Sequence, residues 1–238
     1  MHHSAKAQRL KKQQMIKTLI FDIYGTVIAF EHGLNAETVR DLMRKNGVET
    51  PKEEVHRLWG EYYRAAELED NFRTEAQIFQ DRIAWLYKRY GCKGDPMEAY
   101  NATSATSKKR VAYPEAKDAI EKLRQKYRVV AGSNADKLPL HLNMGDAGIE
   151  MDAYYTSEDL MIYKPRPDFY KKILKAEGLR PEEAVFIGDS IAEDVQAPKA
   201  LGMHAVWVNR IKTPAPYGQD AEVKGLDEIE DVLKTIDL

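Results

Sequence analysis

Cysteine, long apolar runs and an excess of charge are nearly missing from this sequence. Cys92 is the one cysteine among 238 residues, which rules out an intramolecular disulfide and a cysteine-cluster zinc site. No apolar run approaches the roughly 18 residues that a membrane-spanning helix requires. The net charge of -2 creates no strong field toward nucleic acid or an anionic membrane. We therefore expect a cytoplasmic protein, monomeric or homodimeric, whose partner is a small molecule.

The first residues also lack the apolar stretch of a secretory signal. Residues 1–15 are polar and basic, and we interpret them as an N-terminal extension. Of the whole sequence, 43% is hydrophobic, which is enough for one large core together with a small accessory domain.

Short apolar runs alternate with helical patterns along much of the chain. They predict strands over Leu19–Phe21, Arg128–Ala131, Tyr154–Thr156, Ala184–Ile187 and His204–Val208. Helices are predicted over Pro114–Lys126, Asp136–Gly148, Pro167–Glu177, Ile191–Leu201 and Leu226–Ile236. This alternation is typical of an α/β protein with a doubly wound parallel sheet.

The stretch from Leu34 to Lys108 has a helical period throughout and interrupts this alternation after the first strand. Three helices are predicted there, ending near Gly47, Glu69 and Tyr90. Their tryptophans and tyrosines are best explained as the core of a helical bundle. We therefore divide the chain into an α/β core, residues 16–30 and 109–238, and an inserted helical domain, residues 31–108.

Polar groups follow three of the predicted strands. Asp22 ends the first strand, Ser133 and Asn134 end the second, and Asp189 ends the fourth. Lys164 lies on a proline-containing loop before a helix. Because the carboxyl ends of parallel strands meet at one edge, we expect these side chains to lie together. Two acids, a hydroxyl, an amide and an ammonium group suit an anionic substrate held with a divalent cation.

The order of these groups resembles the haloacid dehalogenase-like hydrolase superfamily. The matching motifs are Asp22-Ile23-Tyr24-Gly25-Thr26, Ser133-Asn134, Lys164-Pro165 and Gly188-Asp189-Ser190-Ile191-Ala192-Glu193-Asp194. The resemblance implies a Rossmann-like core with a helical cap, and a hydrolase whose Asp22 forms a covalent aspartyl intermediate. It further implies that Ser133, Asn134 and Lys164 bind the transferred group.

In the magnesium-dependent branch of the superfamily, the resemblance implies a Mg²⁺ ion held by Asp22, the main-chain carbonyl of Tyr24 and Asp189. Asp194 and Ser190 would support these ligands from behind. Asp22, Tyr24 and Lys164 form the expected catalytic set.

Tyr24 departs from the pattern of the phosphatases, which carry a second aspartate at this position to move a proton. The tripeptide Tyr24-Gly25-Thr26 is instead similar to the L-2-haloacid dehalogenases, which use no metal. Asp189 and Asp194 favour the magnesium-dependent branch instead, because a buried acid pair without a cation is costly. Glu193 or Asp194 could supply the missing group, which we leave open.

Three functions follow, in order of preference. The first is Mg²⁺-dependent hydrolysis of a small phosphorylated metabolite. The second is metal-independent dehalogenation of a 2-haloacid by the same aspartate. The third, motivated by Tyr24, is a catalytically weakened binding or regulatory protein that keeps the fold.

Overall fold

A six-stranded sheet forms the centre of the molecule, whose computed structural model describes residues 16–29, 34–107, 110–214 and 216–236. Its strands are β1 (Thr18–Phe21), β2 (Arg128–Ser133), β3 (Ala153–Thr156), β4 (Ala184–Gly188), β5 (His204–Val208) and β6 (Ala221–Val223). All pairs are parallel, in the order β3-β2-β1-β4-β5-β6. The order runs outward from β1 in both directions, so the carboxyl end of β1 lies at the switch point where open α/β sheets bind ligands.

β1 is buried on both faces, as its apolar sequence predicts. Leu19, Ile20 and Phe21 are all 0% exposed. Leu19 and Phe21 belong to the core cluster on one face of the sheet, whereas Ile20 packs with Phe186 on the other. Successive strand side chains point to opposite faces, which explains this division. Burying each such side chain contributes about 1.5–3 kcal/mol, so β1 is a rigid base for the residue that follows it.

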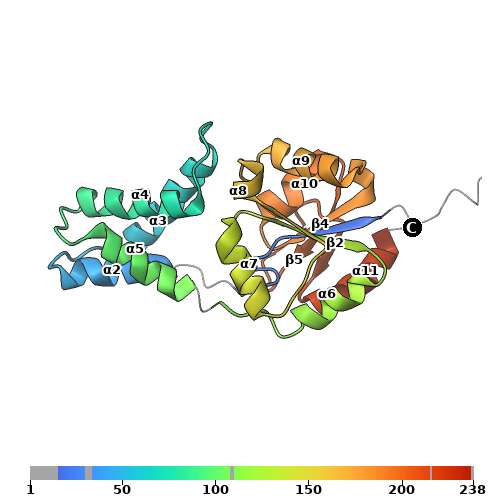
Figure 1. Cartoon of the computed structure of the whole chain (residues 1–238), viewed down its shortest axis with the longest axis horizontal. Helices are drawn as coiled ribbons and strands as arrows, with labels where there is room; N and C mark the ends of the chain where they lie inside the picture. The colour runs from blue at the N-terminus through green and yellow to red at the C-terminus, as the bar shows by residue number, and fades with distance from the viewer. Residues whose placement is uncertain (1–15, 30–33, 108–109, 215, 237–238) are drawn as a thin grey trace, which may run out of the picture.

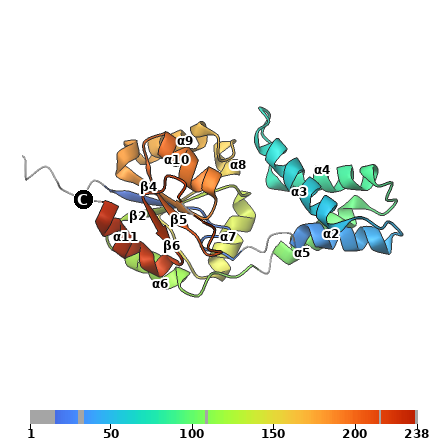
Figure 2. The same ribbon diagram turned by 180° about the vertical axis from the view of Figure 1, so that it is seen from behind.

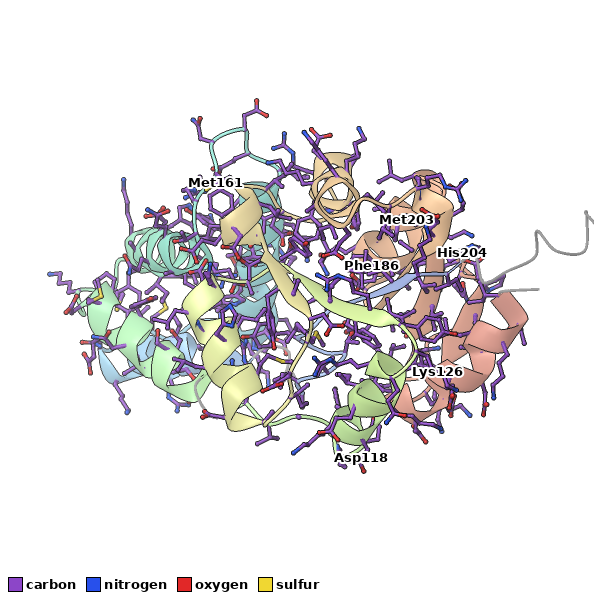
Figure 3. All side chains as sticks on the ribbon, turned by 45° about the vertical axis from the view of Figure 1, so that its right-hand side comes forward. Asp118, Lys126, Met161, Phe186, Met203 and His204 are labelled. Carbon is purple, nitrogen blue, oxygen red and sulfur yellow. The ribbon has the colours of Figure 1, made fainter. Side chains whose placement is uncertain are left out.

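Helices cover both faces of the sheet (Figures 1 and 2). One layer contains α6 (Ala116–Arg124), α7 (Lys137–Asp146) and α11 (Ile229–Ile236). The other contains α9 (Pro167–Glu177) and α10 (Ala197–Ala200), with the short helix α8 (Ser157–Leu160) beside them. Phe186 and Met203, labelled in Figure 3, pack in this second layer. The arrangement is the predicted doubly wound α/β fold.

Four further helices form a cap at the carboxyl edge of the sheet (Figure 1). They are α2 (Leu34–Lys45), α3 (Lys52–Glu67), α4 (Glu75–Arg89) and α5 (Pro96–Ser107). Their shared core contains the tryptophans Trp59 and Trp85, and the guanidinium of Arg82 stacks 3.4 Å from the ring centre of Trp59. Tyr62 and Tyr63 instead pack with Tyr163 of the α/β core. None of the described helices is both long and apolar enough to cross a membrane.

Several elements differ from the sequence prediction. Helix α5, strand β6 and helix α8 were not predicted as separate elements, although α5 falls within the stretch expected to be helical. The segment predicted as one helix from Ile191 begins as a π-helix, η2 (Ile191–Gln196), and continues as α10. The extension at residues 1–15 and both expected domain junctions, at 30/31 and 108/109, involve residues outside the described part of the chain.

Part of the junction between cap and core consists of hydrogen bonds to backbone atoms. Both carboxylate oxygens of Asp136 accept hydrogen bonds from the first amides of α4, from Glu75 at 2.7 Å and Ala76 at 2.9 Å. These amides are unpaired within an α-helix and carry partial positive charge, so a carboxylate there is stabilising. The Tyr163 hydroxyl donates to the carbonyl of Arg73 at 2.9 Å. The start of α4 is therefore fixed close to the end of β2.

Candidate active site

Strand register brings the predicted residues together. Phe21 of β1 is level with Ala131 of β2 and with Ile187 of β4. The next residues along β1 and its neighbours therefore emerge at one edge of the sheet. There the Ser133 hydroxyl donates to Oδ1 of Asp22 at 3.3 Å.

Lys164 enters this site from the loop before α9 and is 1% exposed. Its ammonium group donates to Oδ1 of Asp22 at 2.9 Å and to Oδ1 of Asp194 at 2.8 Å. Burial alone would lower the pKa of Lys164, but the charges of Asp194 and Asp22 outweigh burial and raise it well above its usual value. The group is therefore a permanent cation beside Asp22.

Asn134 fixes the backbone of Lys164 rather than lying free for a ligand. Its Oδ1 accepts from the Lys164 amide at 2.7 Å, and its Nδ2 donates to the Lys164 carbonyl at 3.1 Å. These two contacts hold the lysine loop against the end of β2. Asn134 thereby orients the ammonium group toward Asp22.

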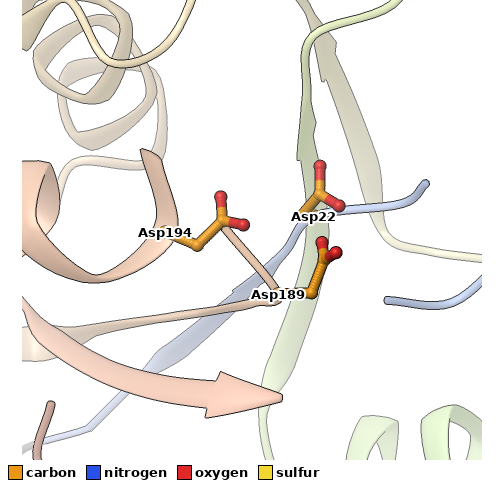
Figure 4. Close-up of side chains that lie close together, drawn as sticks. All are labelled: Asp22, Asp189 and Asp194. Carbon is orange, nitrogen blue, oxygen red and sulfur yellow. The ribbon is translucent and has the colours of Figure 1, made fainter. Parts of the chain in front are cut away.

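Three carboxylates converge at this edge, as Figure 4 shows. Asp22, Asp189 and Asp194 each place an oxygen within 4.8 Å of the others. Burial, with the charges of Asp22 and Asp194, raises the pKa of Asp189 to about 7. Burial also raises the pKa of Asp194, to about 6, against the opposing effect of Lys164. The site concentrates more negative charge than Lys164 neutralises.

The donor set fits a hard divalent cation. Lys164 pairs with Asp22 and Asp194, but among the described residues Asp189 forms no ion pair. Its Oδ1 accepts from the Thr26 hydroxyl at 3.3 Å, a neutral partner. Carboxylate and carbonyl oxygens are the ligands that Mg²⁺ prefers. Asp22 and Asp189, with the carbonyl of Tyr24, could hold such an ion.

Asp194 and Ser190 lie behind the other two acids. Oδ2 of Asp194 accepts from the Ser190 amide at 2.9 Å, while its Oδ1 is occupied by Lys164. The Ser190 hydroxyl accepts from the Glu193 amide at 3.4 Å at the start of η2. A π-helical turn of this kind is frequent at functional sites. Asp194 therefore orients Lys164 in the described structure.

Gly25 makes room for the acid pair, because a Cβ built on it would lie 2.4 Å from Oδ2 of Asp189. Its φ of +96° is also a conformation that residues with side chains rarely adopt. We expect Gly25→Ala to lower the free energy of unfolding by about 2–4 kcal/mol, through backbone strain and displacement of Asp189. Urea denaturation measures this loss. Gly145→Ala is the matched control, since the space around Gly145 in α7 is open. Equal stability of the two variants would contradict the prediction.

Tyr24 lies at the edge of this group. Its hydroxyl accepts a hydrogen bond from Nδ2 of Asn143 on α7 at 2.8 Å, and Arg110 stacks 4.3 Å from its ring centre. Burial raises the pKa of Tyr24 above 10.0, so the hydroxyl is protonated at neutral pH. Its side chain offers no base, which leaves its main-chain carbonyl as the group available to a metal.

Two residues at the site were missed by the sequence analysis. Glu67, the last residue of α3, reaches down from the cap and accepts from Nδ2 of Asn134 at 3.1 Å. Asp136 holds the start of α4. The sequence around Glu67 contains two more acids, Glu69 and Asp70, so its composition alone did not single out one of them.

Two relatives of known activity catalyse different reactions. An (S)-2-haloacid dehalogenase 4A from Burkholderia cepacia is 29% identical over 214 residues, covering 85% of this chain and 87% of the relative. A glyceraldehyde 3-phosphate phosphatase from Pyrococcus furiosus is 26% identical over 221 residues, covering 87% and 84%. The relatives thus agree on hydrolysis and differ on the bond that is cleaved.

Solved structures give the same fold. A defluorinating L-2-haloacid dehalogenase superposes with a TM-score of 0.73 at 20% identity, over 92% of this chain and 95% of the other. The hydrolase YfnB from Bacillus subtilis, bound to magnesium, gives 0.71 at 20% identity, over 92% and 98%. The family model described as haloacid dehalogenase-like hydrolase matches residues 16–202. Fold, site and family model agree, and the chain belongs to the haloacid dehalogenase-like hydrolases.

Proposed function

We propose that this hydrolase is a Mg²⁺-dependent phosphatase acting on a small phosphorylated metabolite. One observation carries the proposal: Asp189 faces Asp22 without a cationic partner of its own in the described structure, although Lys164 lies beside both Asp22 and Asp194. The buried carboxylate of Asp22 and the half-buried carboxylate of Asp189 repel each other at this separation, and a divalent cation between them removes the repulsion. The glyceraldehyde 3-phosphate phosphatase relative makes three-carbon phosphoesters the first substrates to test.

In this proposal Asp22 attacks the phosphorus atom, and the alcohol leaves as a covalent aspartyl phosphate forms. Lys164 faces the attacking oxygen and balances charge on the phosphoryl oxygens. Ser133 donates a hydrogen bond at the same place. Bound Mg²⁺ would shield the phosphoryl charge from Asp22 and neutralise the oxygens as the bond breaks. Water then attacks the phosphorus, which releases phosphate and restores Asp22.

The decisive experiment offers the protein two substrates under two conditions. Phosphate release from p-nitrophenyl phosphate and chloride release from L-2-chloropropionate are each measured with Mg²⁺ and with EDTA. Phosphate release that EDTA abolishes is the expected result. Chloride release that is indifferent to EDTA would overturn the metal-dependent phosphatase.

Hydrolytic dehalogenation is the second candidate. It is favoured by Tyr24, whose protonated hydroxyl provides no base, because a departing halide needs no proton. The Burkholderia cepacia relative also supports it. No turnover of either substrate, together with retained binding of a ligand, would favour the third function, a binding or regulatory protein.

Mg²⁺ should stabilise the folded protein through Asp189. The folded-state pKa of Asp189 is about 7, above its ordinary 3.8, so this carboxyl destabilises the metal-free fold increasingly as pH rises from about 4 through 7. We expect Asp189→Asn to be about 2–4 kcal/mol more stable than the wild type at pH 8 without metal, and nearly equal at pH 4. The melting temperature without metal at both pH values measures this difference.

The same variants report on metal binding. Saturating Mg²⁺ at pH 8 should raise the melting temperature of the wild type, because a hundredfold excess over Kd adds about 2.7 kcal/mol to its free energy of unfolding. The melting temperature of Asp189→Asn should not change. Asp168→Asn, which changes an exposed acid on α9, is the matched control and should respond like the wild type. A Mg²⁺ response in Asp189→Asn as large as in the wild type would refute the site.

A further inference from the structure

We propose that Glu67 of the cap is the general acid and base of this hydrolysis, a role that rests on the proposed phosphatase function. An alcohol is a poor leaving group unless a proton reaches its oxygen as the P–O bond breaks. Tyr24 occupies the position where an acid next to Asp22 would do this, and its hydroxyl is bound by Asn143. The proton therefore has to come from another part of the chain.

Glu67 is in contact with the residues that surround Asp22. The residue is 6% exposed, and its Oε1 accepts from Nδ2 of Asn134 at 3.1 Å. The same amide group contacts the carbonyl of Lys164, whose ammonium group binds Asp22. Glu67 also lines a cavity of about 70 Å³ with Tyr163 and Arg166, at the seam between cap and core. Glu67 thus lies between the loop that carries Lys164 and a cavity at the boundary of the cap.

The direction of attack favours an acid from the cap. Asp22 approaches the phosphorus from the end of β1, and in-line displacement places the leaving oxygen on the opposite side. That side faces the cap, which lies beyond the carboxyl edge of the sheet (Figure 1). Asp194 already binds Lys164. Glu193 lies on η2, after the end of β4; its Oε2 accepts from the same Nδ2 of Asn134 at 3.3 Å and lies 3.8 Å from the Lys164 ammonium nitrogen. Of the two carboxylates that meet at Asn134, Glu67 is the one carried by the cap, on the side to which in-line attack assigns the leaving oxygen.

The surroundings of Glu67 favour both the donation of a proton and the acceptance of one near neutral pH. Burial, together with the nearby charge of Glu75 on α4, raises the pKa of Glu67 to about 7. The Asn134 hydrogen bond, Lys164 and Arg64 oppose this rise without cancelling it. At neutral pH the group is therefore divided between an acid that gives a proton and a base that accepts one.

The two steps balance with this one proton. In the first, an oxygen of Asp22 bonds to phosphorus, the P–O bond to the alcohol breaks, and protonated Glu67 gives its proton to the departing oxygen. In the second, the Glu67 carboxylate takes a proton from water while the water oxygen bonds to phosphorus. The bond between phosphorus and Asp22 then breaks, leaving phosphate, the Asp22 carboxylate and protonated Glu67.

Leaving-group dependence tests the role. For Glu67→Gln with Mg²⁺, we expect kcat/KM for glycerol 3-phosphate or another alkyl phosphate to fall about 10²–10⁴-fold. The kcat/KM for 2,4-dinitrophenyl phosphate, whose phenolate leaves without a proton, should stay within about threefold of the wild type. Because the second step needs the base, rapid quench and mass spectrometry should find phosphorylated Asp22 accumulating from this aryl substrate. In the wild type, kcat/KM for the alkyl phosphate should fall as pH rises past about 7, and in Glu67→Gln this fall should be absent.

Glu69→Gln is the matched control, since Glu69 follows two residues later and pairs with Arg73 at 2.8 Å. It should hydrolyse both substrates like the wild type. Equal losses on both substrates in Glu67→Gln, no loss on either, or a wild type that hydrolyses aryl but no alkyl phosphates would overturn the role of Glu67. Absence of Asp22-dependent phosphate release from the aryl substrate in the wild type would instead overturn the phosphatase function itself.

Discussion

Replacing Lys164 with methionine should destabilise the protein by about 3–5 kcal/mol at pH 8. The ammonium group is the shared partner of Asp22 and Asp194, and Lys164 is 1% exposed. Methionine fills a similar volume but leaves two buried carboxylates without a cation. Catalysis should fall about 10³-fold as well, because no fixed positive charge would remain beside the attacking oxygen.

Urea denaturation at two pH values separates this explanation from a packing defect. Asp194 has a pKa of about 6, so at pH 5 it can protonate and most of the deficit of Lys164→Met should vanish. Adding Asp194→Asn to the variant should recover part of the stability at pH 8. Lys171→Met on the surface of α9 is the control, with an expected change within about 0.5 kcal/mol. A deficit that is the same at both pH values would point to packing rather than charge.

Replacing Asp22 with asparagine should reduce phosphate release at least about 10⁴-fold while the protein stays folded. An amide of the same shape has no nucleophilic carboxylate. Lys164 would still be paired with Asp194, so we expect little change in melting temperature. The wild type quenched during turnover should carry a phosphoryl group on Asp22, which mass spectrometry detects.

Asp118→Asn provides the reference for this measurement, because Asp118 is an exposed acid on α6 (Figure 3). It should retain full activity. Substantial turnover by Asp22→Asn, or a phosphoryl group trapped on another residue, would show that the nucleophile has been misassigned.

The strands and their polar ends were predictable because their signals are local. A short run such as Leu19–Phe21 has no polar side chain and is suited to complete burial, and Asp22 and Asp189 follow such runs directly. Parallel pairing then determines that the ends of β1, β2 and β4 meet. Lys164 was identified from its loop and from the resemblance, and the structure places it beside Asp22.

What escaped prediction depends on contacts between distant parts of the chain. Glu67 differs from Glu69 and Asp70 through its meeting with Asn134, which is 67 residues away in sequence. Helix α5 has small and polar residues over most of its length, so it lacks the apolar stripe that marked its neighbours. The change from π-helix to α-helix after Gln196 likewise leaves no trace in a hydrophobic period.

The attachment of the cap through Asp136 has a consequence for how such enzymes diversify. Asp136 accepts hydrogen bonds from two main-chain amides at the start of α4, and no side chain of α4 takes part in these two bonds. Any sequence that begins a helix at this position would place the same main-chain amides next to Asp136. This contact therefore tolerates substitution of the side chains at the start of α4, because it depends on the main chain alone.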